Sequence, residues 1–153
     1  MADVGEIADL TARETIRRHD VEQRNQYTVV REVVVNGLVE VARHNPEAIE
    51  EHGETILAAT GDTSPTVAGA AIDVIAELAN HGYSVPDNTR PVITDLLDFE
   101  SDFVQARAIR ALRYLEATES ADAISDFATQ TDDPELQELA EETAAWLREQ
   151  PNP

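Results

Sequence analysis

Three arginines follow one another at intervals of three residues in the second half of this chain, at Arg107, Arg110 and Arg113. On a helix this spacing places them on one broad face. No acidic residue occurs within the segment 103–115, although the chain as a whole is strongly acidic. Guanidinium groups bind carboxylates through paired hydrogen bonds, and Tyr114 adds an aromatic contact beside them. These four side chains, called the arginine strip below, are predicted to bind an acidic segment of a partner protein.

The alternative is that the arginine strip forms ion pairs within the molecule. If helices lie alongside it, the carboxylates of Asp73, Glu77 or Glu141 would be within reach. In that case the strip is a structural seam, and a partner would bind elsewhere.

The remaining basic and aromatic residues favour structural roles. Glu14, Asp20 and Glu22 interleave with a second group of arginines, so local ion pairing is expected for Arg13, Arg17, Arg18 and Arg24. His44 and His81 are separated by 37 residues, each near a predicted helix C-terminus, where the helix dipole favours a cation. We therefore expect no metal at either histidine. Trp146 is the single tryptophan and is expected in the core or as an end cap.

Recognisable catalytic motifs do not occur in the sequence. It contains no glycine-rich phosphate loop, no G-x-S-x-G, no H-E-x-x-H and no lysine for a Schiff base. We expect a protein without enzymatic activity, cofactors or bound metals.

Charge and composition restrict the partners and the habitat. The 153 residues carry a net charge of −20, all basic residues are arginine, and cysteine is absent. Such a surface repels nucleic acid and anionic membranes. Acidity without lysine resembles proteins of halophilic archaea, whose cytosol screens self-repulsion; the alternative is an ordinary acidic protein. With no signal peptide and no long apolar run, we expect a soluble, cytoplasmic protein.

Apolar residues at helical spacing recur four times along the chain. The recurring pattern begins at Val30, Val67, Val104 and Leu136, with separations of 37, 37 and 32 residues. From each starting residue, the positions 3, 4, 7, 8 and 11 residues further on are almost all apolar or small. The predicted helices span residues 3–20, 28–42, 46–60, 65–80, 84–99, 103–115, 121–129 and 134–148. A repeat at a near-constant period predicts stacked helix pairs.

Two turn segments carry a resemblance to a known family. Asp62-Thr-Ser-Pro-Thr-Val67 and Glu100-Ser-Asp-Phe-Val104 both place an acid-bearing turn before a valine and an alanine-rich helix. This pattern resembles HEAT repeats. The family often has arginine directly after that valine; Arg31 matches, whereas Ala68, Gln105 and Gln137 do not.

The resemblance implies an all-α fold, an armadillo-type solenoid of about four antiparallel helix pairs. It also implies one domain over residues 1–153, with repeats at about 3–44, 46–81, 86–116 and 119–149. Related proteins use the second helix of each pair for binding. We therefore expect a protein-binding adaptor or scaffold. The alternatives are a lyase-type or chaperone-type subunit that holds a client protein, and a structural homo-oligomer.

Overall fold

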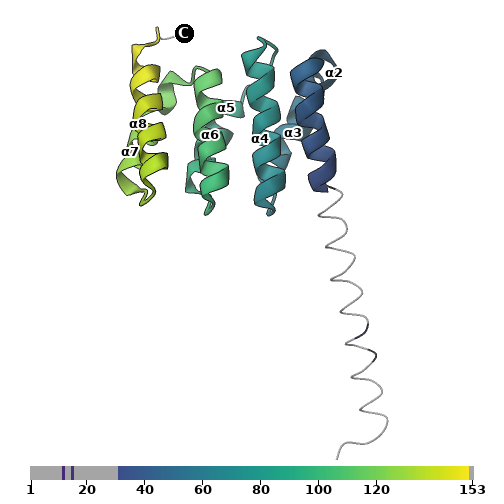
Figure 1. The fold of residues 1–153 in the computed structure, drawn as a ribbon. Coiled ribbons are helices and arrows are strands. Elements are labelled where there is room, and N and C mark those ends of the chain that lie inside the picture. The colour runs from purple at the N-terminus through teal and green to yellow at the C-terminus, as the bar shows by residue number, and fades with distance from the viewer. Residues whose placement is uncertain (1–11, 13–14, 16–30, 152–153) are drawn as a thin grey trace, which may run out of the picture.

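The structure, a computed structural model, describes residues 12, 15 and 31–151 (Figure 1). Helices are the only regular elements of this described part, so the predicted all-α class is confirmed. A first helical segment spans residues 31–44. The remaining helices, in chain order, are α2 (Glu47–Glu50), α3 (Gly53–Ala59), α4 (Pro65–Asn80), α5 (Thr89–Asp95), the 3₁₀ turn η1 (Leu96–Asp98), α6 (Asp102–Tyr114), η2 (Thr118–Ser120), α7 (Ala121–Gln130) and α8 (Pro134–Glu149).

The helices form two layers (Figure 1). Segment 31–44, α4, α6 and α8 lie side by side and make one layer, which we call the second helices. The first helices, α2 with α3, then α5, then α7, lie behind them, and each packs on the second helix that follows it. Because each pair buries apolar surface against the next, the core is continuous along the stack. The predicted solenoid of antiparallel helix pairs is confirmed.

Short polar side chains cap the N-termini of the second helices α4, α6 and α8. The hydroxyls of Ser64 and Ser101 accept hydrogen bonds from the third backbone N–H of α4 and of α6. The Asp133 carboxylate caps α8 in the same way. Gly82 follows α4 with φ of 78°, a left-handed conformation that favours glycine. The turns that set the repeat are therefore encoded locally.

Two predicted first helices are shorter than expected. The predicted helix 46–60 is interrupted, because His52 takes non-helical angles and α3 restarts at Gly53. A Cβ on Gly53 would lie 3.1 Å from the Pro86 ring, so the two turns approach closely here. The predicted helix 84–99 begins only at Thr89, whose hydroxyl donates to the Pro86 carbonyl at 2.6 Å.

The predicted inward face of the segment 31–44 is confirmed only in part, unlike that of α6, because Leu38 packs against the core but three of the predicted valines are exposed. Val33, Val34 and Val41 are 67%, 54% and 40% exposed, and it is Val39 and Ala42 that are buried. This helix is apolar over more than one face, so periodicity alone does not identify the buried side. In α6 the predicted core residues Val104, Ala108, Ala111, Leu112 and Leu115 are all buried. The predicted helix 3–20 lies outside the described residues, apart from Ala12 and Thr15.

Candidate protein-binding groove

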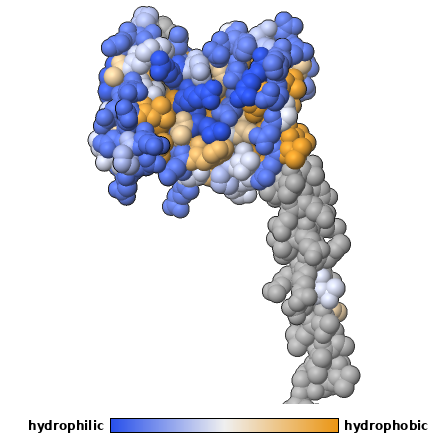
Figure 2. Space-filling model, viewed as in Figure 1, coloured by the Kyte–Doolittle hydropathy of each residue, from blue (hydrophilic) through white to orange (hydrophobic). Residues whose placement is uncertain are grey.

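The arginine strip lines a groove between α6 and α8. The groove has a volume of about 450 Å³, and α8 lies less closely against α6 than α4 does. All four residues predicted from the sequence contribute to it, together with Ala106 of α6 and with Leu139 and Thr143 of α8. Apolar and small side chains therefore alternate with guanidinium groups along one depression. Figure 2 shows hydrophobic and hydrophilic residues intermixed on this face of the molecule.

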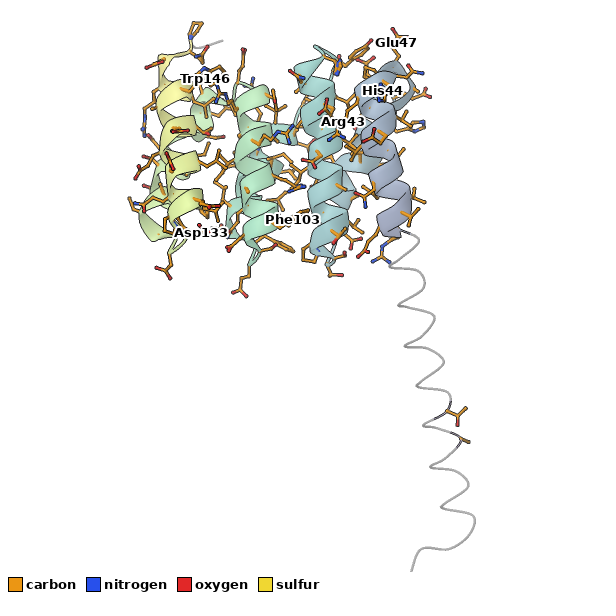
Figure 3. All side chains as sticks on the ribbon, viewed as in Figure 1. Arg43, His44, Glu47, Phe103, Asp133 and Trp146 are labelled. Carbon is orange, nitrogen blue, oxygen red and sulfur yellow. The ribbon has the colours of Figure 1, made fainter. Side chains whose placement is uncertain are left out.

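Each arginine of the strip lies over an aromatic ring. The guanidinium carbon of Arg107 is 3.7 Å from the ring centroid of Phe103, and that of Arg110 is 5.6 Å from the ring of Tyr114. Arg113 lies 4.8 Å from the ring of Trp146 on α8. Figure 3 shows Phe103 near the start of α6 and Trp146 near the end of α8, so the contacts are spread along the helices. Stacking leaves the N–H edges of a guanidinium group available for carboxylates.

Ion pairs divide the arginine strip into two parts. Arg107 Nε lies 3.0 Å from Asp73 Oδ2 on α4, so the predicted internal pairing is confirmed at this position. Arg110 is 4.0 Å from Glu77, which also approaches Arg43 at 3.7 Å. No described carboxylate lies within 4.0 Å of Arg113. The groove thus has one structural arginine, one weakly paired and one unpaired within the described chain.

Exposure follows the same division. The side chain of Arg107 is 32% exposed and that of Arg110 is 47% exposed, and Arg113 and Tyr114 are also exposed to solvent. Asp73 Oδ1 is buried and has no hydrogen-bond partner among the described residues, so this carboxylate depends on Arg107. Arg110, Arg113 and Tyr114 remain accessible to a ligand.

Gly69 of α4 makes room for the ring on which Arg107 stacks. A Cβ added to Gly69 would lie 2.2 Å from Phe103 Cε1 and 3.0 Å from Arg107 Cδ. Only a glycine therefore allows the Phe103 ring to lie against α4. The approach of Phe103 to Gly69 was not predicted, because the sequence shows a glycine in a helix but not which side chain lies against it.

We expect Gly69→Ala to destabilise the protein by about 1–3 kcal/mol, because the methyl group must displace the ring and disturb the Asp73–Arg107 pair. Chemical denaturation measures the change in unfolding free energy. The matched control is Gly61→Ala, whose new Cβ would meet the nearest atom at an ordinary 3.7 Å. Equal stability of the two variants would contradict the described packing of Phe103.

The charge of the groove contrasts with that of a neighbouring hollow. A depression of about 580 Å³ between η1, the start of α6 and the end of α7 is lined by four carboxylates, those of Asp98, Asp102, Asp132 and Asp133, and by no basic residue. An acidic ligand would be repelled there, whereas the groove between α6 and α8 has three cations in its lining. Of these two depressions, the groove between α6 and α8 is therefore the one in which a negative charge would meet less repulsion.

The other candidates from the sequence are placed as follows. His44 ends the segment 31–44 and His81 caps α4; each lies within 4.0 Å of a glutamate one turn earlier, Glu40 and Glu77. The described part of the chain contains no cluster of three potential metal ligands.

Trp146 packs against the core and also borders the groove through Arg113. The residues Arg13, Arg17, Arg18 and Arg24 lie outside the described part.

Arg31, the arginine that follows the first valine of the pattern, links two repeats. Arg31 meets Asp62, the acid of the next turn, with Nε 3.3 Å from Oδ2 and Nη2 3.3 Å from Oδ1. At the equivalent place in a later repeat, the Gln105 amide instead donates to the carbonyls of Leu97 and Phe99, at 3.2 and 2.8 Å. Gln105 therefore binds to the end of the first helix of its own pair, whereas Arg31 binds to the turn of the next repeat.

A comparison with known protein families identifies the type of helical repeat. Residues 53–145, more than half of the chain, match the family described as HEAT repeats. The chain belongs to the HEAT-repeat family. Searches of curated proteins and of solved structures gave no match. Within this HEAT-repeat protein the matched region includes α3 to most of α8, and therefore the whole groove. None of its described helices is long and apolar enough to cross a bilayer.

Proposed function

We propose that this HEAT-repeat protein is a non-catalytic adaptor or scaffold that binds an acidic segment of another protein in the groove between α6 and α8. The observation that carries the proposal is the set of three arginine–aromatic stacks around one groove. In a molecule of net charge −20, a depression lined by cations is where an anionic segment meets least repulsion.

The groove supports both polar and apolar contacts. Exposed ion pairs contribute roughly 0–1 kcal/mol each, so Arg110 and Arg113 alone would bind weakly. Tyr114 and Leu139 supply apolar surface beside them. We therefore infer a partner segment that combines carboxylates with at least one large apolar side chain, since aromatic and arginine contacts dominate binding energy at such interfaces.

Charge reversal tests this function. In the double variant Arg110→Glu with Arg113→Glu, we expect the affinity for a partner recovered by pull-down to fall by about 100-fold or more, because two attractive contacts become repulsive. Both side chains are exposed, so the variant is expected to remain folded. Calorimetric titration gives the affinity, and circular dichroism verifies the fold.

Arg148→Glu is the matched control. Arg148 lies on the same helix layer, at the end of α8, and pairs with the exposed Asp122 at 3.0 Å outside the groove. This variant should bind like the unmodified protein. A folded double variant with unchanged affinity would show that the partner binds elsewhere.

We also propose that the protein works in the cytoplasm of a halophilic archaeon. The support is compositional: the chain has 31 acidic residues against 11 basic ones. At molar salt the Debye length is about 3 Å, and repulsion among these carboxylates is screened. Under such conditions electrostatic steering is short-ranged, so the apolar part of the groove matters more for binding.

A further inference from the structure

A buried hydroxyl lies in the wall of the groove between α6 and α8. Thr143 of α8 lines this groove and is only 1% exposed. Its side chain forms no hydrogen bond with any residue that the structure describes. Burial of a hydroxyl without a partner is unfavourable, because the hydrogen bonds that it made with water in the unfolded chain are not replaced.

The other buried hydroxyls are satisfied within the protein. In the described part of the chain, three further polar side chains are buried, and each forms a hydrogen bond of 2.6 to 2.8 Å: Thr60 with the carbonyl of Leu57, Thr89 with that of Pro86, and Ser120 with the hydroxyl of Thr94. A helical threonine can satisfy its hydroxyl on a carbonyl one turn earlier. Thr143 has no such bond in the described structure, so its hydroxyl is available to a ligand that enters the groove.

The repeat pattern has apolar residues at the position of Thr143. Seven residues after the start of the pattern come Val74 in α4 and Ala111 in α6, and both are fully buried. Valine has nearly the same volume as threonine but lacks the hydroxyl. Packing alone therefore does not account for a threonine at this place.

Arg110 is the residue of α6 that lies opposite Thr143. The two helices run in the same direction in the layer of second helices (Figure 1). Their register is given by Arg113 of α6, which stacks on Trp146 of α8 at 4.8 Å. Three residues earlier, about one turn back along each helix, come Arg110 and Thr143. Both of these residues line the groove.

We propose that the Thr143 hydroxyl and the Arg110 guanidinium group form a subsite for one carboxylate of the bound segment. This inference rests on the proposed function and names the point at which that function holds the acidic segment. The hydroxyl donates a hydrogen bond to one carboxylate oxygen, and the guanidinium N–H groups donate to the carboxylate from the other side of the groove. Arg110 can turn to this ligand because its contact with Glu77 is long, at 4.0 Å.

Removal of the hydroxyl tests the subsite. The probe is a synthetic peptide of glutamates flanking one leucine, titrated calorimetrically into the full-length protein. Thr143→Val is expected to weaken binding about tenfold, because a hydrogen bond to a charged group is lost. Thr143→Ser keeps the hydroxyl and is the matched control, with an affinity expected within about twofold of that of the unmodified protein.

A double-mutant cycle with Arg110→Ala separates direct contact from altered packing. If both groups hold the same carboxylate, Thr143→Val should change the affinity by less than about twofold once the guanidinium group is absent. The midpoint of chemical denaturation should not fall in Thr143→Val, since no internal hydrogen bond is removed.

Three results would overturn the subsite while leaving the proposed function intact. They are unchanged peptide affinity in Thr143→Val, an equal loss of affinity with and without Arg110, and a lower denaturation midpoint in Thr143→Val. Failure of the unmodified protein to bind the acidic peptide would instead contradict the proposed function, and the subsite with it.

Discussion

Ala108→Glu is expected to destabilise the protein by about 3–5 kcal/mol, enough to unfold most of the α6 region. Ala108 is fully buried near the centre of α6, the helix that packs on both α4 and α5. Glutamate there would place a carboxylate without a partner in the core, where burial of an uncompensated charge is strongly unfavourable. Chemical denaturation followed by circular dichroism measures the loss of unfolding free energy.

Arg110→Glu is the control for this prediction, since it introduces the same side chain two residues away. Arg110 is 47% exposed and its nearest carboxylate, on Glu77, is 4.0 Å distant. The expected cost is about 1 kcal/mol or less, from a lost weak pair and added repulsion. If both variants unfold at the same denaturant concentration, the assignment of buried and exposed faces on α6 is incorrect.

Potassium chloride is expected to stabilise the protein by about 3 kcal/mol between 0.1 M and 3 M, which corresponds to a rise in Tm of roughly 10 °C for a chain of this size. Many carboxylates have no cationic partner within the described chain; Asp98, Asp126 and Asp132 are examples. The Debye length is about 10 Å at 0.1 M and about 3 Å at 1 M, so salt removes their mutual repulsion.

The matched measurement uses sucrose in place of salt, which favours the compact state without screening charge. A Tm that rises with potassium chloride well beyond the sucrose response supports the electrostatic cause. An identical Tm at 0.1 M and 3 M would contradict adaptation to high salt.

The second helices were predictable because their signals are local and agree with one another. In α4 and α6 the acid-bearing turn before the helix and the apolar pattern within it give the observed boundaries to within one residue. First helices lack this agreement. Close contact between Gly53 and Pro86 comes from residues 33 positions apart, and nothing in the local sequence at Gly53 specifies it.

The arginines and the tyrosine that α6 contributes to the groove could be predicted from the sequence. The spacing of the three arginines identified the face on α6, and the acid-free segment marked its charge. Of the aromatic partners, Tyr114 was predicted beside the arginines, whereas Phe103 was not, and Trp146 reaches Arg113 from another helix. The role of Gly69 depends on the approach of α6 to α4, which a pattern of apolar residues does not define.

The fluorescence of Trp146 tests the central claim most directly, because it is the single tryptophan and lies 4.8 Å from Arg113 at the groove. The probe is a synthetic peptide of glutamates flanking one leucine, compared with a peptide in which glutamine replaces each glutamate. We predict a saturable change in Trp146 emission with the acidic peptide, weakened about tenfold or more by Arg110→Glu, which leaves the Arg113–Trp146 stack in place. Emission that does not respond to the acidic peptide, or that responds equally to both peptides, would contradict an acidic-segment site between α6 and α8.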